Sequence, residues 1–277
     1  MRAMRPGLVS VTFRSLSAED VLRLMPASGL ECIEWGGDVH VPVGGLATAD
    51  AVGRQTREAG ISITAYGSYF CLDASEQKGE PFAAVLDTAV KLGAPSIRVW
   101  AGSRSKASAD PGHLRRAAED AARIADLARA AGLVICLEYH PDTLTDSIES
   151  AGRLLNLIPH PGVFSLWQQP TGPDVAQCLD SLRAVLPRLH HVHVFHWSPD
   201  PSHRLALDEG ENRWRGYLRL LAASGRNPDL LLEFVPGDLP GLLRREAASL
   251  RRWLSEVEET AGLGTGRRNP APETGNL

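Results

Sequence analysis

Short apolar runs recur eight times along this chain, and each is separated from the next by an amphipathic stretch with helical spacing. The runs are Leu8–Phe13, Leu30–Trp35, Ile61–Tyr66, Ser96–Trp100, Leu133–Glu138, Val163–Trp167, Leu189–Phe195 and Leu230–Val235. Glycines such as Gly60 and Gly93 end helical stretches just before a strand, where a left-handed helix cap is expected. Strict alternation predicts a parallel sheet, and eight units predict an α/β fold of the (β/α)8 TIM barrel type.

Length and composition indicate one domain. The 277 residues, 43% of them apolar, are enough for one large core, so we expect a single barrel over residues 1–257. Residues 258–277 are polar and rich in Gly and Pro, which is typical of a disordered tail. The first strand is not followed by a GxGxxG motif, which argues against a dinucleotide-binding sheet.

Charge and cysteine usage exclude several classes of protein. The net charge is −4 and no basic block stands out, so we expect no nucleic-acid partner. No window is long and apolar enough for a membrane span, and the short first run is interrupted by Ser10 and Thr12, unlike a signal peptide. The four cysteines lie far apart with no CxxC spacing, and the first three, Cys32, Cys71 and Cys136, lie in or near apolar runs. They are expected to be reduced core thiols, which suits a cytoplasmic protein.

Polar side chains close four of the predicted strands in the second half of the chain. They are Glu138, Gln169, His193 and Glu233, spaced 24 to 40 residues apart as successive βα units would be. In a parallel barrel these strand ends meet at the carboxyl mouth. Two carboxylates, an imidazole and an amide oxygen there predict a site for a divalent cation.

Each of these residues has a structural alternative. A glutamate that closes a buried strand could instead pair with an arginine inside the barrel, and Arg98 is an available partner for Glu138. Strand alternation places His191 and His193 on one face; His193 is the favoured ligand and His191 a deeper, hydrogen-bonded histidine. Gln169 could equally hydrogen-bond a substrate hydroxyl.

Other strand ends suggest a substrate pocket. Aromatic side chains could form its walls, polar ones could reach hydroxyl groups, and a loop arginine could hold an anionic group such as phosphate. In that order these are Trp35, Tyr66, Trp100 and Trp167; His40, Ser68 and His140; and Arg204. The alternative for any single aromatic residue is a place in the barrel core.

These phrases together resemble the xylose isomerase-like barrel superfamily of sugar isomerases, epimerases and dehydratases. The resemblance rests on residues 33–40 (IEWGGDVH), residues 137–140 (LEYH), residues 191–193 (HVH), residues 232–234 (LEF) and the Gly210-Glu211 step. It implies that Glu138, His193 and Glu233 are metal ligands. The family usually has an aspartate at the end of strand six, where this chain reads Trp167-Gln168-Gln169-Pro170.

The expected function is that of a metal-dependent sugar or sugar phosphate isomerase or epimerase. A divalent ion (Mn, Mg, Co or Zn) would polarise the substrate carbonyl and stabilise an enediolate, with Glu138 and Glu233 as the acid and base. Loss of a β-hydroxyl would make the enzyme a dehydratase. The partner is a small carbohydrate, and a homodimer is a further expectation. Two alternatives stay open: a metal-free sugar-binding or regulatory barrel, favoured by the glutamine at strand six, and a phosphodiesterase of the endonuclease IV type.

Overall fold

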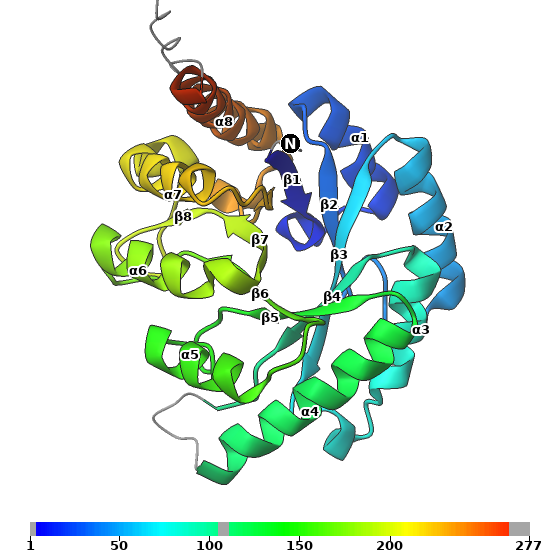
Figure 1. Ribbon diagram of the computed structural model, residues 1–277. Helices are drawn as coiled ribbons and strands as arrows, with labels where there is room; N and C mark the ends of the chain where they lie inside the picture. Colours follow the sequence, from blue (N-terminus) through cyan, green and yellow to red (C-terminus); the bar gives the residue numbers. More distant parts are fainter. Residues whose placement is uncertain (1–3, 105–110, 266–277) are drawn as a thin grey trace, which may run out of the picture.

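The computed structural model describes residues 4–104 and 111–265, and it shows a closed barrel of eight parallel strands surrounded by helices (Figure 1). Neighbouring strands run in the order β1-β10-β7-β6-β5-β4-β3-β2, with β1 closing the ring against both β10 and β2. The predicted (β/α)8 fold is therefore confirmed.

The strands and helices alternate in the predicted order. The barrel strands are β1 (Arg5–Val9), β2 (Cys32–Gly36), β3 (Ser62–Cys71), β4 (Ser96–Trp100), β5 (Val134–Glu138), β6 (Val163–Gln168), β7 (Leu189–Val194) and β10 (Asp229–Leu232). The α-helices are α1 (Ala18–Ser28), α2 (Leu46–Glu58), α3 (Phe82–Leu92), α4 (Pro111–Ala130), α5 (Ile148–Leu157), α6 (Val175–Val185), α7 (Glu211–Ala223) and α8 (Leu243–Thr265).

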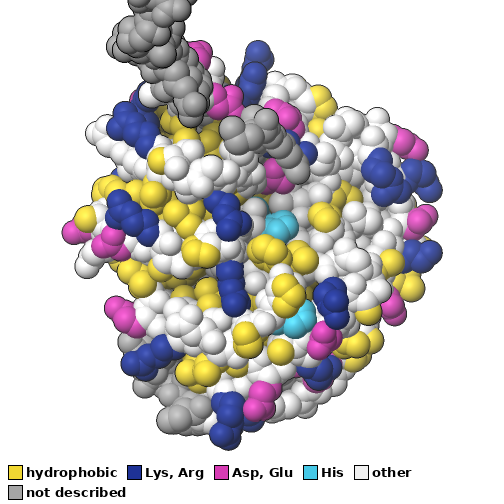
Figure 2. Space-filling model, in the orientation of Figure 1, with side chains coloured by type: hydrophobic (Ala, Val, Ile, Leu, Met, Phe, Trp, Pro, Cys, Tyr) yellow, Lys and Arg dark blue, Asp and Glu magenta, His cyan; other side chains and the backbone are white. Residues whose placement is uncertain are grey.

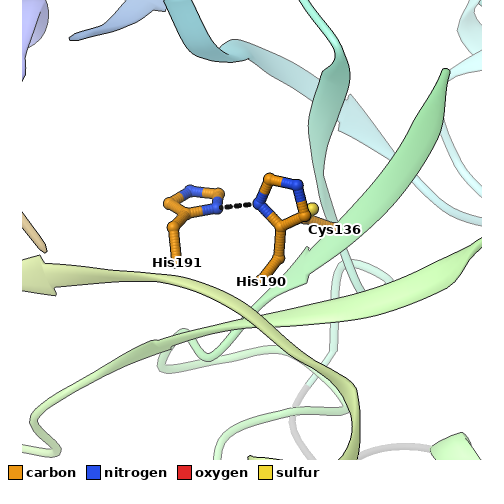
Figure 3. Close-up of side chains that lie close together, drawn as sticks. All are labelled: Cys136, His190 and His191. Atoms are coloured by element: carbon orange, nitrogen blue, oxygen red, sulfur yellow. Dashed lines mark hydrogen bonds between the residues drawn. The ribbon is translucent and has the colours of Figure 1, made fainter. Parts of the chain in front are cut away.

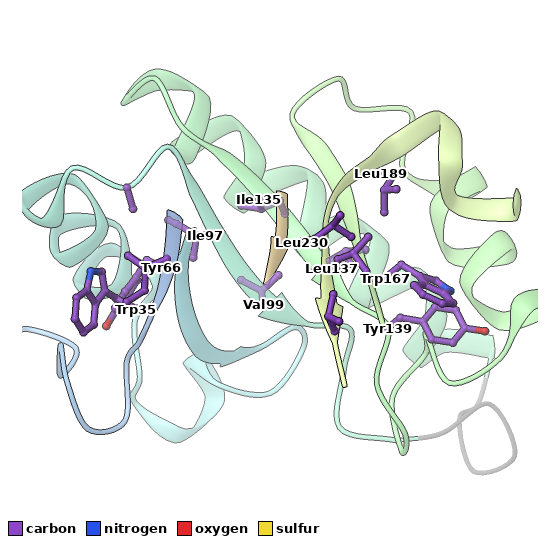
Figure 4. Packing of buried hydrophobic residues seen from close by; sticks show 14 of the residues in the cluster. Trp35, Tyr66, Ile97, Val99, Ile135, Leu137, Tyr139, Trp167, Leu189 and Leu230 are labelled. Atoms are coloured by element: carbon purple, nitrogen blue, oxygen red, sulfur yellow. The ribbon is translucent and has the colours of Figure 1, made fainter. Parts of the chain in front are cut away.

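The main core lies between the barrel and the helices. Trp35, Tyr66, Ile97 and Ile135 are aligned across β2 to β5 and are fully buried in this layer (Figure 4). A small second apolar cluster of Val9, Val11, Cys32 and Leu231 is separate from it. Because side chains alternate along a strand, the residues between the helix-facing ones point into the barrel, and many of these are charged.

Three segments differ from the sequence-based expectation. The first strand ends at Val9, and residues Ser10–Phe13 form the 3-10 helix η1, where Ser10 Oγ accepts a hydrogen bond from the Gly36 N–H. The polar stretch after β7 carries a small antiparallel hairpin of β8 (His196–Trp197) and β9 (Arg204–Leu205). The domain boundary predicted at residue 257 falls inside α8, and residues 266–277 lie outside the described residues.

Within the described residues, no helix combines the length and apolar character needed to cross a membrane. The four cysteines are all free and buried, as expected for reduced core thiols.

Candidate active site

A cavity of about 1110 Å³ opens at the carboxyl end of the barrel. Its walls include Arg98, Glu138, Gln168, Gln169 and Glu233, which come from β4, β5 and β6 or from residues just after β6 and β10. Parallel strands bring these side chains together because their carboxyl ends share one rim of the barrel. The convergence predicted for Glu138, Gln169 and Glu233 is therefore observed around one cavity.

Glu138 is held by an ion pair inside the barrel. Its Oε2 accepts hydrogen bonds from Arg98 Nη1 and from Trp100 Nε1, the latter at 2.6 Å. Burial alone would raise the pKa of Glu138, but the Arg98 guanidinium lowers it below the usual value, so Glu138 is a carboxylate at neutral pH. The structure therefore contains the Arg98–Glu138 ion pair that the sequence analysis gave as the alternative to metal binding by Glu138.

Arg98 also pairs with Glu34, a residue that the sequence argument did not select. Arg98 Nε lies 2.8 Å from Glu34 Oε1, and both side chains are almost fully buried. Despite its burial, the pKa of Glu34 is well below the usual value because His193 and Arg98 surround it with positive charge. The signal was present in the sequence: Glu34 interrupts a buried apolar strand as Glu138 and Glu233 do.

Gly67 in β3 leaves room for this ion pair. A Cβ built there would lie 2.5 Å from Glu34 Oε1 and 2.9 Å from Arg98 Nη2, so a side chain at this position would displace the ion pair. The glycine is therefore required by close approach and not by its backbone angles.

His193 lies below the cavity, between two carboxylates. Its Nδ1 is 3.1 Å from Glu233 Oε2 and its Nε2 is 3.2 Å from Glu34 Oε2. Burial opposes a charge on the ring, but Glu233 and Glu34 outweigh it and raise the pKa of His193 to about 10. His193 is therefore an imidazolium at neutral pH, and it links the cavity carboxylate to the interior one.

Glu233 sits at a sharp turn of the chain. The next residue, Phe234, has φ 57°, a left-handed value that a bulky residue rarely adopts, and its N–H donates to Thr12 Oγ1 at 3.1 Å. This turn ends β10 and leaves the Glu233 carboxylate on the cavity wall, with 7% of the residue exposed.

The four predicted metal ligands do not form a ready site. Glu138 is engaged by Arg98 and Trp100, and both nitrogens of His193 face carboxylates. The amide oxygens of Gln168 and Gln169 are buried without a hydrogen-bond partner, so they could serve as donors. Register pairs Gln168 with His193, which places Gln168, rather than the predicted Gln169, at the same level of the barrel. Glu138 and His193 thus have other partners in this arrangement, and the predicted four-ligand cation site stays a prediction.

Two other groups of described residues could hold a metal ion. They are Glu34 with His191 and His193, and Cys136 with His190 and His191; in each, the ligand atoms lie within 4.8 Å of one another. Neither group is the predicted set.

Several predicted substrate residues lie away from the cavity. Trp35 and Trp167 face the helices, where their Nε1 atoms donate to Thr56 of α2 and Ser181 of α6, and the Tyr66 hydroxyl donates to the Val41 carbonyl. The sequence alone could not show which way these aromatic side chains point, because both faces of the strands carry residues that are buried. Three polar residues are also engaged elsewhere: His40 bonds the Leu16 carbonyl, Ser68 donates to the Arg98 carbonyl, and Arg204 pairs with Asp238.

Trp100 and His140 do line the cavity. Their rings are stacked with centroids 4.8 Å apart, and Tyr69 meets Trp100 edge-on at 5.5 Å. A second aromatic group, Phe195, Trp197 and Phe234, also contributes to the walls and was not anticipated. The cavity thus combines aromatic walls with charged groups at its base, which suits a small ligand that has both an apolar face and polar substituents.

The sequence profile of one known family, described as the xylose isomerase-like TIM barrel, matches residues 22–254. The chain belongs to this family. A 3-dehydroshikimate dehydratase of Bacillus anthracis is 23% identical over 205 residues, which cover 69% of this chain and 71% of that protein.

Solved structures of the family share the fold. A probable 3-DHS dehydratase from Bacillus anthracis superimposes with a TM-score of 0.75 at 20% identity, covering 90% of this chain and 99% of that one. An L-ribulose 3-epimerase gives 0.75 at 18% identity, covering 96% and 100%. Two other structural neighbours were solved with a bound metal. One is a xylose isomerase-like TIM barrel protein from Mycobacterium smegmatis with magnesium (TM-score 0.69), and the other is the IOLI protein with zinc (TM-score 0.71).

Proposed function

We propose that this chain is an isomerase, epimerase or dehydratase that moves a proton next to the carbonyl group of a small sugar-like substrate. The observation that carries the proposal is Glu233, a nearly buried carboxylate on the cavity wall with the His193 imidazolium behind it. Membership of a family with epimerase and dehydratase neighbours supports this class of reaction.

In the proposed reaction, Glu233 takes the proton from the carbon beside the carbonyl. The C–H electron pair forms the new C=C bond, and the carbonyl π pair moves onto the oxygen, giving an enolate. Arg98, which lines the cavity, offers a fixed positive charge to that oxygen without reorganisation of solvent. Return of the proton to the other face of the same carbon gives an epimer. Return to the former carbonyl carbon, with transfer of the proton of the adjacent hydroxyl to the enolate oxygen, gives an isomer. Departure of a β-hydroxyl as water, with the proton that Glu233 holds, gives a dehydrated product.

Glu138 is proposed as the second carboxylate that faces the substrate. Because Arg98 lowers its pKa, Glu138 is a weak proton acceptor, so the first proton transfer, from carbon to a carboxylate, is assigned to Glu233. Dependence on a divalent cation stays a prediction. It is measured by assaying the protein after chelation and after addition of Mn²⁺ or Mg²⁺.

Hydrogen exchange tests the proposal directly. In D₂O, wild-type protein should replace the hydrogen beside the carbonyl of its substrate with deuterium, which NMR detects in a panel of ketoses, aldoses and cyclic hydroxyketones. Glu233→Gln should slow exchange by at least 100-fold, as expected for a lost general base. The matched control is Glu246→Gln: Glu246 is also buried, but it bonds the Leu207 N–H instead of facing the main cavity. Full exchange by Glu233→Gln would rule out its role as base.

A binding protein without catalysis is the second candidate. It is favoured by the glutamines at the end of β6 and by the Arg98–Glu138 ion pair, which engages one predicted ligand. Saturable sugar binding without deuterium exchange would support it. The endonuclease-type alternative is less well supported. Basic and acidic side chains are interspersed on the face shown in Figure 2, whereas a protein that binds the phosphate backbone usually has a continuous basic stripe.

A further inference from the structure

A second cluster of metal-binding side chains lies one layer deeper in the barrel than the cavity residues. Cys136 precedes Glu138 by two positions on β5, and His191 precedes His193 by two positions on β7. Together with His190 they bring one sulfur and two ring nitrogens within 4.8 Å of one another (Figure 3). None of the three lines the large cavity.

His190 reaches this cluster because β6 and β7 are out of step. Ser165 pairs with Leu189, but Leu166 pairs with His191, so His190 is the extra residue of a bulge. Simple alternation would turn its ring toward the helices. Instead, His190 Nδ1 lies 2.9 Å from His191 Nδ1, and its ring meets Phe164 edge-on at 5.9 Å.

We infer that Cys136, His190 and His191 form a zinc site. One thiolate and two imidazoles are a donor set that Zn²⁺ prefers over Mg²⁺ or Ca²⁺, and three protein ligands leave a fourth position for water. Zinc–ligand bonds are about 2.0–2.3 Å long, so a spacing within 4.8 Å needs only small side-chain movements to close on an ion. Binding converts the Cys136 thiol to a thiolate and releases its proton to solvent.

Glu34 supplies the outer support that such a site requires. His191 Nε2 lies 3.0 Å from Glu34 Oε2, and a carboxylate there fixes the proton on Nε2. The lone pair of His191 then lies on Nδ1, the nitrogen that faces His190. The same carboxylate–histidine arrangement orients ligands in many zinc proteins.

The site lies toward the amino end of the strands, below the level of the cavity residues. Cys136 and His191 are fully buried, whereas His190, the second residue of β7, is partly exposed. His190 is therefore the member of the site nearest to solvent, on the opposite side from the cavity that holds Glu233.

Cobalt spectroscopy on the full-length, chelator-treated protein tests the inference. Co²⁺ should produce a thiolate-to-cobalt charge-transfer band that saturates at about one equivalent and disappears when Zn²⁺ is added. Cys136→Ser should abolish the band, and His190→Ala should weaken Co²⁺ binding at least tenfold. Because His190 is partly exposed, its replacement keeps the test valid even if Cys136→Ser fails to fold.

Two variants serve as controls. Cys178→Ser removes another buried thiol, in α6, and should leave the band unchanged. Glu233→Gln alters the cavity and should leave the band in place, although the hydrogen bonds through His193 and Glu34 can shift the Co²⁺ affinity. Persistence of the band separates this site from the proposed reaction. Absence of the band in folded wild-type protein, its survival in Cys136→Ser, or its loss in Glu233→Gln would each overturn the inference.

Discussion

Arg98 is the residue on which the charge balance of the barrel interior depends. Its guanidinium lies between Glu34 and Glu138, and all three side chains are at most 4% exposed. Removal of one partner from a buried ion pair leaves an uncompensated charge, which costs more than the pair itself contributes.

Replacement of Arg98 by methionine should therefore lower the free energy of unfolding by about 3–5 kcal/mol. Denaturant unfolding followed by circular dichroism measures this. Arg183→Met is the matched control, because Arg183 pairs with Asp180 on the exposed surface and should change stability by less than about 1 kcal/mol. Equal losses in the two variants would contradict the importance of the buried pair.

His193 should make stability depend on alkaline pH. Its pKa is about 10 in the folded protein and about 6.5 in an unfolded chain, so its protonated form stabilises the fold. That contribution is complete below about pH 6.5 and is lost as the pH rises through 10. We expect stability to fall over this interval in wild-type protein and to fall less steeply in His193→Gln. Parallel pH profiles for the two proteins would show that the imidazolium contributes nothing.

The sequence identified some residues of the site correctly and others not. Glu138 and Glu233 were identifiable because a carboxylate at the end of an apolar strand must have a partner or a function. The prediction that Trp35 and Trp167 line the pocket was wrong. The residues on either side of each tryptophan are also buried, so the sequence does not show which side chains face the barrel interior and which face the helices. The sequence offered Arg98 as one possible partner of Glu138. It could not show that the two side chains are in contact, because the distance between side chains of β4 and β5 depends on the folded barrel.

At the scale of elements, the hairpin of β8 and β9 forms part of the cavity wall. Arg204 in β9 lies over the rings of Phe234 and Trp197, at 4.4 and 5.4 Å, and donates to Asp238 in the 3-10 helix η5 (Pro236–Asp238). Arg204 thereby ties the hairpin to the segment that follows Glu233. The sequence analysis placed Arg204 in a loop that could hold an anionic group. The antiparallel pairing of β8 with β9 could not be predicted from these polar residues alone.

Arg204→Ala should loosen this wall and raise KM several-fold with little change in kcat, since Arg204 does not line the cavity. Asp238→Ala should have a similar effect. In a double-mutant cycle, the two changes together should cost less than their sum, because each removes the same contact. Steady-state kinetics on the substrate found by deuterium exchange gives the answer, and strictly additive effects would argue against the tie.

Over the whole molecule, closure of the barrel joins the first strand of the sheet, β1, to the last, β10. Arg5 in β1 donates from Nε and Nη2 to both carboxylate oxygens of Asp229 in β10, at 2.8 and 2.7 Å, and Thr64 in β3 donates to the same aspartate. The eight alternating strand and helix patterns predicted a barrel, but they did not predict which side chains would connect β1 to β10.

Asp229→Asn should therefore destabilise the entire barrel rather than one edge. We expect a loss of about 1.5–3 kcal/mol, the size of a charged hydrogen-bonded contact. Tryptophan fluorescence and far-UV circular dichroism should still report one coincident unfolding transition, because β1 and β10 belong to the same closed sheet. Two separate transitions would mean that the seam opens independently.

The hydrogen bonds from Glu233 through His193, Glu34 and His191 to His190 connect the cavity with the amino end of β7. Thermodynamic linkage then applies between the two ends. If a ligand that contacts Glu233 alters how firmly His191 is held, an ion at His190 must alter the affinity of that ligand by the same factor. Binding of an ion at the amino end of the barrel would then change ligand affinity at the carboxyl end, and ligand binding would change the affinity for the ion.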